Sequence, residues 1–380
     1  MKIIFKHITL LTILYFTECQ IQACTSFAVY SEQIWYGMNF DYANTPIRFS
    51  IVTNGTKKVF RAEFGTGGYI AGINEAGLFT NYQLLYYNGA TPTFEEDNTL
   101  GIGNLNEHSI NNLNTVAEVN SYIGDRSLVP SYGQDLHTLY ADTINNAMVV
   151  EPFGAENGIT PVQNNFIVMT NFPNYDFLGE EYTAVYGVGG DRYILAFEYI
   201  QDHISDFSYE DGFETMSRTA QRTGDYPTQI SLLFDPLNLE IYFCLNHDFS
   251  RVWKVSFQNE TLETYSGFSQ HLSYNLDEVG IWVSELQNDI TGVEDFYNSK
   301  NQIIRIYPNP TSGQFSIDLS NLSVTNSKIE VHSNLGKRVF SKDFLHQSTT
   351  TIDLTNRPKG IYFVRVLNNA VSRSEYLILE

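Results

Sequence analysis

The chain is poor in cysteine, in positive charge and in long apolar runs. Its 380 residues include three cysteines, and 22 Lys or Arg stand against 43 Asp or Glu. A net charge of −21 repels phosphate backbones, so the composition predicts that nucleic acid is not a partner. Beyond residue 23 no apolar run reaches membrane-spanning length, which predicts a mature chain that is soluble or attached to a surface.

Common catalytic and cofactor motifs are also missing. The histidines have neither HExxH nor another zinc-ligand spacing, and no GxSxG occurs. The glycine pairs in GTGG at 65–68 and GVGG at 187–190 do not form the phosphate-binding GxxxxGK[ST] and are expected to be turns. We therefore predict that the protein uses no metal and no organic cofactor.

The N-terminus has the pattern of a targeting segment. Lys2 and Lys6 precede an apolar run from Ile8 to Phe16, and a more polar stretch then ends at the small residue Ala23. The run is too short to cross a bilayer as a helix, so residues 1–23 are predicted to be a secretory signal peptide. Cleavage after residue 23 would make a cysteine the first residue of the mature chain.

That cysteine, Cys24, has two plain alternatives to a catalytic role. An exported protein can form disulfides, so a bridge from Cys24 to Cys244 is one of them. Lipid attachment is the other, but Gln22 is a poor fit to a lipoprotein signal, which prefers a small residue there. Cys244 lies in an apolar strand pattern and is expected in the core.

The pattern after Cys24 predicts an α+β domain over residues 24–283. Alternating runs such as IWYGMNFDY, KKVFRAEF and NFIVMTNF predict strands, and helical spacing is found over 108–123, 192–204 and 212–222. Three further strand patterns, TQISLLFD, EIYFCLNH and RVWKVSF, are expected to close the domain. Strands, then helices, then strands favour a layered α+β fold over a doubly wound sheet.

The C-terminal part differs in charge and pattern. Residues 284–302 are polar and aperiodic and are predicted to be a linker. Residues 303–380 carry nine basic and six acidic residues, whereas 24–302 carry 11 basic and 36 acidic residues. Turn signals at Pro308-Asn309-Pro310 and Ser312-Gly313 separate alternating runs, which predicts an all-β sandwich of about seven strands without catalytic residues.

A cysteine at a new N-terminus would carry a thiol and an α-amine on one residue. The α-amine has a pKa of roughly 7.7–8.0, far below that of lysine, so it can act as a base near neutral pH. Cys24 would then supply both nucleophile and base, as an N-terminal threonine does in other hydrolases. No separate histidine is required.

The segments CTSFAVY and YGMNFDY resemble the start of the choloylglycine hydrolase superfamily of N-terminal-nucleophile (Ntn) hydrolases. That group includes bile salt hydrolases, penicillin V acylases and acid ceramidase, and the CTS opening leans toward the acid ceramidase-like branch. The resemblance extends along residues 24–256. It implies a four-layer αββα sandwich and hydrolysis of a linear amide, an N-acyl amide substrate, through a thioester.

The resemblance also implies a set of site residues. The family nucleophile falls on Cys24, and the aspartate of its G-R-N-x-D motif falls on Asp41, which would hold the α-ammonium. The asparagine after N-E-x-G-L falls on Asn81, as an oxyanion donor. The asparagine of T-N-x-P falls on Asn171, as an orienting residue, and the arginine that opens a helix falls on Arg192, placed to stabilise the thiolate.

The sequence departs from the family at Met38, where G-R-N-x-D has its arginine. Arg48 is one candidate to supply the missing charge. The departure leaves two other functions open: a surface lipoprotein or binding module with an inactive Ntn fold, and an acyltransferase. Bile salt conjugates, penicillin V, N-acyl homoserine lactones and N-acyl lipids are all compatible substrates.

The C-terminal module resembles the sorting domain of type IX secretion cargo, which is found in Bacteroidota. The residues that carry the resemblance are YPNPTSGQFSIDL and KGIYFVRV. It implies the type IX secretion machinery as a partner, and a chain that is secreted or held at the outer surface after passing through the periplasm. A carbohydrate-binding or adhesive sandwich is the alternative.

Overall fold

The computed structural model describes residues 24–65, 67–94, 96–154, 156–290, 305–318, 326–333, 338–345, 349–367 and 372–380. The predicted signal peptide and most of the predicted linker lie outside the described residues. The chain divides into two compact units, Met1–Gln287 and Asn288–Glu380.

The first unit is built on two large antiparallel sheets. In the first sheet the strand order is β13-β1-β2-β14-β15-β16-β17-β18, so β1 lies between β13 and β2. The two neighbours of β2 are β1 and β14. β14 is distant from β2 in the sequence, since Thr228 of β14 pairs with Asp41 of β2. The strands are β1 (Thr25–Tyr30), β2 (Ile34–Asp41), β13 (Phe166–Met169), β14 (Thr228–Asp235), β15 (Glu240–Leu245), β16 (Val252–Ser256), β17 (Thr261–Ser266) and β18 (Ser273–Asn275).

The second sheet has the order β12-β11-β10-β6-β5-β4-β3-β19, and β7 (Gln83–Leu84) pairs with β10 beside this path. Its strands are β3 (Ile47–Asn54), β4 (Lys57–Phe64), β5 (Gly68–Asn74), β6 (Phe79–Asn81), β10 (Leu136–Ala141), β11 (Ala147–Glu151), β12 (Gly158–Pro161) and β19 (Ile281–Trp282). A small parallel pair, β8 (Thr99–Gly101) and β9 (Ser127–Val129), lies outside both sheets.

Phenylalanine rings fill the space between the sheets. Phe49 and Phe79 of the second sheet lie 4.7 Å from Phe243 and 4.9 Å from Phe234 of the first sheet, measured between ring centroids. All four side chains are fully buried. Burial of one such ring stabilises the fold by roughly 1.5–3 kcal/mol. Rings from the inward-facing positions of both sheets thus form one aromatic core.

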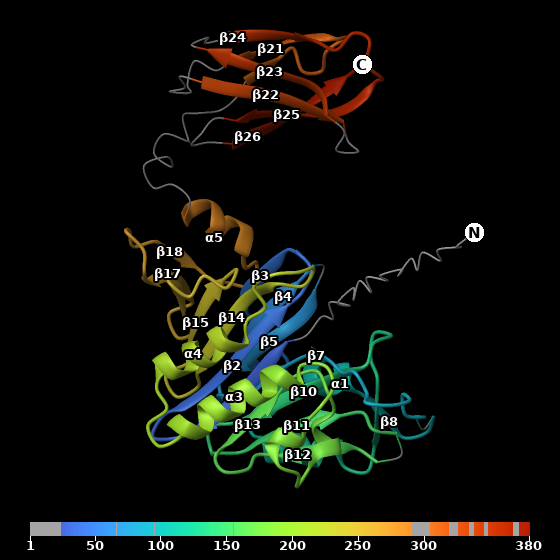
Figure 1. Cartoon of the computed structure of the whole chain (residues 1–380), viewed down its shortest axis with the longest axis vertical. Coiled ribbons are helices and arrows are strands. Elements are labelled where there is room, and N and C mark those ends of the chain that lie inside the picture. Colours follow the sequence, from blue (N-terminus) through green and yellow to red (C-terminus); the bar gives the residue numbers. More distant parts are fainter. Residues whose placement is uncertain are drawn as a thin grey trace, which may run out of the picture. The chain divides into compact units, whose positions relative to one another are not determined.

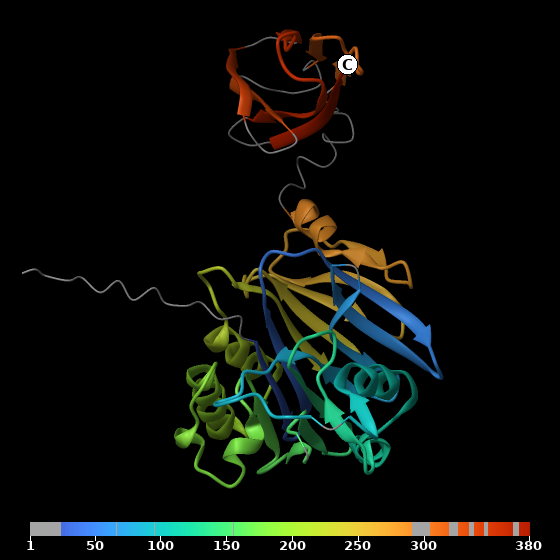
Figure 2. The ribbon, with the colours of Figure 1, turned by 90° about the vertical axis from the view of Figure 1, so that its right-hand side faces the viewer.

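Helices cover the outer face of each sheet (Figures 1 and 2). On the first sheet, α3 (Gly190–His203) and α4 (Tyr209–Thr219) bury Ala196, Ile200 and Met216 against Phe27 and Val29. On the second sheet, α1 (Ile102–Asn112) and α2 (Val116–Ile123) bury Leu105 and Val119 against Tyr140 and Met148. The four-layer αββα arrangement predicted from the resemblance is therefore confirmed.

Two details of this unit differ from the sequence prediction. The expected helix over 108–123 is two helices, because Thr115 caps the second one by accepting a hydrogen bond from the Glu118 backbone N–H. The domain also does not end with the third of the expected closing strands. It continues through β17, β18 and β19 into a helix, α5 (Val283–Ile290), which occupies the first residues of the expected linker.

The second unit is a small all-β sandwich. Its described strands form a three-stranded sheet, β20-β21-β24, and a four-stranded sheet, β23-β22-β25-β26. Phe315 and Ile352 from one sheet and Val331 and Val364 from the other share one buried core. The described strands are β20 (Arg305–Tyr307), β21 (Gln314–Asp318), β22 (Asn326–Ser333), β23 (Arg338–Leu345), β24 (Thr349–Asp353), β25 (Gly360–Leu367) and β26 (Ser372–Leu379).

Candidate active site

Cys24 lies directly before β1, at the edge of a cavity. Its side chain is 4% exposed, and its sulfur accepts a hydrogen bond from the Asp41 backbone N–H at 3.4 Å. The contact follows from strand pairing, because Thr25 pairs with Asn39 and the residues just beyond that pair come together. Cys244 lies in the core of β15, and both cysteines are free, so no disulfide joins them.

Asp41 ends β2, and its buried carboxylate receives donors from three separate segments. Oδ1 accepts a hydrogen bond from the Thr228 hydroxyl of β14. Oδ2 accepts from Gln221 Nε2 at 3.0 Å and from Arg192 Nη1 at 3.3 Å. The carboxylate therefore ties β14, the segment after α4 and the start of α3 to the strand beside Cys24.

Burial is the largest influence on the pKa values of Cys24 and Asp41. It raises the pKa of Asp41 to about 6, although Arg192 and the hydrogen bonds from Thr228 and Gln221 act in the opposite direction. Burial, and then the Asp41 charge, raise the pKa of the Cys24 thiol to about 12. In the 380-residue chain, where the Cys24 nitrogen is still in a peptide bond to Ala23, the thiol is therefore neutral and needs a base.

Arg192 opens α3 and points back at the first residues of β1. Its Nη1 donates to the Cys24 carbonyl oxygen at 3.0 Å and to the Thr25 hydroxyl at 3.2 Å, besides contacting Asp41. Gly189 precedes it with φ of +82°, and a Cβ there would come within 2.5 Å of the guanidinium. Glycine is required at this position because it allows both the left-handed backbone and the close approach of Arg192.

Asn81 and Asn171 lie near the site but do not line the cavity. The Asn81 amide nitrogen donates to the Ser26 hydroxyl and lies 3.5 Å from the Met38 sulfur, and its oxygen accepts from the Leu139 N–H at 3.0 Å. The Asn171 amide nitrogen donates to the Leu84 carbonyl at 2.6 Å. Both asparagines are fully buried and brace the strands behind Cys24.

The methionine that replaces the family arginine is part of this packed layer. Met38 is fully buried and pairs with Ser26 across β1 and β2. Arg48 does not replace the missing charge, because its guanidinium is bound to Glu63 and lies over the Trp282 ring. Of the arginines with described side chains, it is Arg192 that contacts both Cys24 and Asp41.

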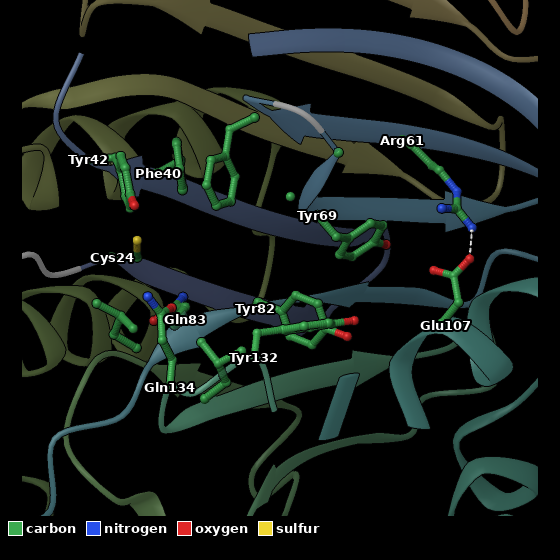
Figure 3. Close-up of a pocket in the computed structure, with 15 residues that line it drawn as sticks. Cys24, Phe40, Tyr42, Arg61, Tyr69, Tyr82, Gln83, Glu107, Tyr132 and Gln134 are labelled. Atoms are coloured by element: carbon green, nitrogen blue, oxygen red, sulfur yellow. Dashed lines mark hydrogen bonds and ion pairs between the residues drawn. The ribbon is translucent and has the colours of Figure 1, made fainter. Parts of the chain in front are cut away.

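Gln83 was not among the predicted site residues, but it lines the cavity beside Cys24 (Figure 3). With its amide oriented to satisfy both ends, its oxygen accepts from the Ser26 hydroxyl and from the Ser26 N–H at 3.2 Å. Its nitrogen donates to the Thr170 carbonyl at 3.0 Å. Residues 81 and 83 face the same side of an extended segment. Strand alternation from Asn81 could therefore have indicated Gln83 as a site residue.

The cavity itself has a volume of about 460 Å³, within the range of small-molecule sites. Figure 3 shows Cys24 near one end and the ion pair between Arg61 and Glu107 near the other. Half of the other lining residues are aromatic. The lining residues are Cys24, Phe40, Tyr42, Arg61, Phe64, Gly67, Gly68, Tyr69, Tyr82, Gln83, Leu84, Glu107, Tyr132, Gln134 and Leu136.

Comparison with known families agrees with this arrangement. Residues 36–193 match the linear amide C-N hydrolases, choloylglycine hydrolase family. Over these residues the chain is similar to hydrolases of linear amide C–N bonds, and this is the activity that the match supports. Residues 305–380 match the secretion system C-terminal sorting domain, which implies secretion or display at the outer surface.

Solved structures of similar proteins include two hydrolases. One is a mutant of the conjugated bile acid hydrolase from Clostridium perfringens, with 16% identity, 67% of this chain and 97% of that chain covered, and a TM-score of 0.48. The other is penicillin V acylase from Agrobacterium tumefaciens, with 17% identity, 61% and 91% covered, and a TM-score of 0.47. No curated protein matches the chain.

The described residues contain no group of three or more His, Cys, Asp or Glu side chains placed to hold a metal ion. None of the described helices is both long and apolar enough to cross a membrane.

Proposed function

We propose that the protein, once residues 1–23 are removed, hydrolyses an N-acyl amide with Cys24 as its nucleophile. The observation that carries the proposal is the position of the Cys24 sulfur. It lines a 460 Å³ cavity and touches the residue whose buried carboxylate is paired with Arg192. Asp41 and Arg192 do not line the cavity, so the charges that contact Cys24 lie outside the space that a substrate would occupy, which suits attack on an uncharged carbonyl.

The raised thiol pKa supports a role for the new N-terminus. A thiol with a pKa of about 12 is a poor nucleophile at neutral pH unless a base takes its proton. Cleavage after Ala23 would create an α-amine on the same residue. The Asp41 backbone contacts the Cys24 sulfur, and its carboxylate shares Arg192 with the Cys24 carbonyl, so Asp41 is the group that we expect to hold this amine. The precursor would then be inactive, and processing would switch the enzyme on.

The reaction proceeds in two halves. The α-amine takes the thiol proton, the sulfur bonds to the substrate carbonyl carbon, and the resulting ammonium gives its proton to the departing amine. A water molecule then attacks the thioester while the α-amine accepts the water proton, and the acid leaves as the sulfur regains a proton. Each half returns the α-amine to its neutral form, and the second half restores the free thiol of Cys24.

We propose Gln83 as the side-chain oxyanion donor in place of Asn81. Its amide nitrogen carries two hydrogens, and the contact with Thr170 uses one of them. Asn81 has both of its amide hydrogens directed at Ser26 and Met38, behind the cavity wall. We assign Asn81 and Asn171 to positioning, and Arg192 to stabilising Asp41 and the thiolate.

Intact mass and a substrate panel test the proposal. The secreted protein should begin at Cys24 with a free amine, and it should hydrolyse at least one N-acyl amide. Cys24→Ala should lose activity by at least about 10³-fold, while Cys24→Ser should retain a trace. Cys244→Ala is the matched control, because it removes the other thiol from the core and should leave the rate unchanged.

Three results would contradict the proposal or redirect it. A diacylglyceryl adduct on Cys24 would make the protein a lipoprotein. Equal activity of the wild type and Cys24→Ala would place the chemistry elsewhere. Transfer of the acyl group to added amines in preference to water would make the enzyme an acyltransferase.

A further inference from the structure

The cavity is polar at the end that lies far from Cys24. Figure 3 shows Arg61 and Glu107 there, and the Tyr69, Tyr82 and Tyr132 rings between that end and Cys24. In this view the three tyrosine hydroxyls point toward the ion pair and the rings face the middle of the cavity. A bound molecule would therefore meet apolar ring faces first and hydrogen-bonding groups last.

The charge at the polar end is already compensated. Arg61 Nη2 donates to Glu107 at 2.7 Å and to the Asn111 side-chain oxygen at 2.9 Å, and Nη1 lies 3.9 Å from Glu63. Glu63 is also bound to Arg48, so the two arginines and two glutamates of this group balance in charge. Because both arginines are already paired, an anion brought to this end would give up its water without gaining a cation, whereas an uncharged hydroxyl could bond to Arg61 or Glu107.

The hydroxyl groups of Tyr69 and Tyr82 can accept a hydrogen bond from a ligand, because their own hydrogens are already donated to carbonyl groups. Tyr82 donates its hydroxyl hydrogen to the Gly103 carbonyl at 3.0 Å, and Tyr69 donates to the Thr80 carbonyl at 3.3 Å. Their oxygen lone pairs remain, and Glu107 adds a carboxylate whose side chain is 46% exposed. This end of the cavity therefore favours a group that donates a hydrogen bond.

The middle of the cavity favours a flat, apolar body. The Tyr69 and Tyr82 rings pack edge to face with centroids 5.5 Å apart, and Phe40, Tyr42 and Phe64 form a second ring cluster. Ring walls of this kind accept another ring system by stacking and edge contacts.

We propose that Arg61 and Glu107 select an acyl group with a flat apolar body and an uncharged hydroxyl at the end far from the scissile amide. This inference rests on the proposed function, because it takes the carbonyl to lie at Cys24. It makes Arg61 and Glu107 specificity-determining residues that act on the substrate and take no part in bond cleavage.

A matched set of nitroanilide substrates tests the inference. The acyl groups are biphenylacetyl, para-hydroxybiphenylacetyl and para-carboxybiphenylacetyl, which share one body and differ at the far end. We expect kcat/KM for the hydroxyl substrate to exceed that of the unsubstituted one by about 3- to 10-fold, the value of one net hydrogen bond. The carboxylate substrate should be cleaved more slowly than either.

Variants of the ion pair sharpen the test. Arg61→Met and Glu107→Gln should each remove the preference for the hydroxyl substrate. Glu107→Gln should also raise the relative rate of the carboxylate substrate about tenfold, because it frees the guanidinium for an anion. Arg48→Met is the control: Arg48 also pairs with a glutamate and lies over an aromatic ring, but it does not line the cavity.

Binding separates failure of this inference from failure of the proposed function. Calorimetry on Cys24→Ala with the three nitroanilides should give the same order of affinity as the rates. If the variant binds them in that order but the wild type cleaves no amide, the proposed function is wrong and the inference about this end stands. Equal affinity and equal rates for all three, or an unchanged preference in both ion-pair variants, would overturn the inference.

Discussion

The two sheets of the catalytic unit contribute different groups to one cavity. The first sheet and its helix carry Cys24, Asp41 and Arg192, which are charged or ionisable and are joined by hydrogen bonds. The second sheet carries Gln83 and Tyr69, which are neutral, and Arg61, whose charge is paired with Glu107 of α1; all four line the wall. The first sheet thus supplies the nucleophile and its charged partners, whereas the second sheet supplies the proposed oxyanion donor and the groups that meet the substrate.

The largest effect is expected from Arg192→Met, on the side of the first sheet. It leaves a buried carboxylate without its cation, so we expect a loss of about 3 kcal/mol in unfolding free energy and at least about 10²-fold in kcat. The pKa of Asp41 should rise further, because Arg192 lowers it.

Denaturant unfolding and steady-state kinetics measure both quantities for Arg192→Met. Arg192→Lys should rescue part of the stability but not all three contacts of Nη1, since the shorter lysine side chain cannot place its nitrogen at the same point. Arg218→Met, which breaks an exposed helix pair with Glu214, is the control and should change neither. A normal kcat in Arg192→Met would show that the first sheet does not need this charge for chemistry.

The next effect distinguishes Gln83 from Asn81. Gln83→Leu removes the proposed oxyanion donor and should lower kcat by about 10²-fold with little change in KM. Asn81→Leu leaves the Leu139 N–H without its acceptor and removes one of the two partners of the Ser26 hydroxyl, so it should reduce stability by about 2 kcal/mol and leave the kcat of the folded fraction nearly intact. The reverse pattern in the two variants would return the oxyanion role to Asn81.

A smaller effect comes from the titration of Asp41 before processing. Burial raises its pKa in the folded chain to about 6, above the ordinary aspartate value of about 3.9, so folding favours the neutral form. The stability that this provides is complete below about pH 4 and is lost as the pH rises through about 6, a change on the order of 2–3 kcal/mol.

Chain that retains Ala23 should therefore lose unfolding free energy over that pH interval relative to Asp41→Asn. Processed chain should lose less, because the new α-ammonium lowers the pKa of Asp41. Identical pH profiles for the two forms would place the α-amine away from this carboxylate.

The smallest effect is expected at the rim of the cavity that contains Cys24. Tyr132 is 76% exposed and lines the cavity, so Tyr132→Ala should raise KM about threefold and leave kcat unchanged. Tyr186, which is 63% exposed and lies away from the cavity wall, provides the matched control Tyr186→Ala. A fall in kcat for Tyr132→Ala would extend the chemical role to the second sheet's loops.

Local sequence pattern predicted most of the fold, because alternation and helical spacing report burial directly. The layered class, the strands that carry Cys24 and Asp41, and the helix that begins near Arg192 follow from such patterns and the resemblance. The break at Thr115 was not predicted, because the apolar spacing continues across it. The extra strands β17 to β19 were missed because they are short and partly exposed.

The site was harder to predict where it depends on which side of a strand faces the cavity. Cys24, Asp41 and Arg192 lie together because three distant segments pair around β1 and β2. Asn81 and Gln83 both contact Ser26 from one segment, and only the three-dimensional path shows that Gln83 borders the cavity. The ion pair of Arg61 and Glu107 joins β4 to α1, and no short motif marks such a contact.

The pairing of β2 with β14 also limits when the site can form during synthesis of the chain. Thr228 and Gln221 complete the carboxylate network of Asp41, so no ribosome-bound or truncated chain that stops short of them can assemble the site. Under the proposed function, a reactive thiol would thereby be absent from incomplete chains. The α-amine base would exist only after cleavage, which would give the cell a second safeguard against amide hydrolysis in the wrong compartment.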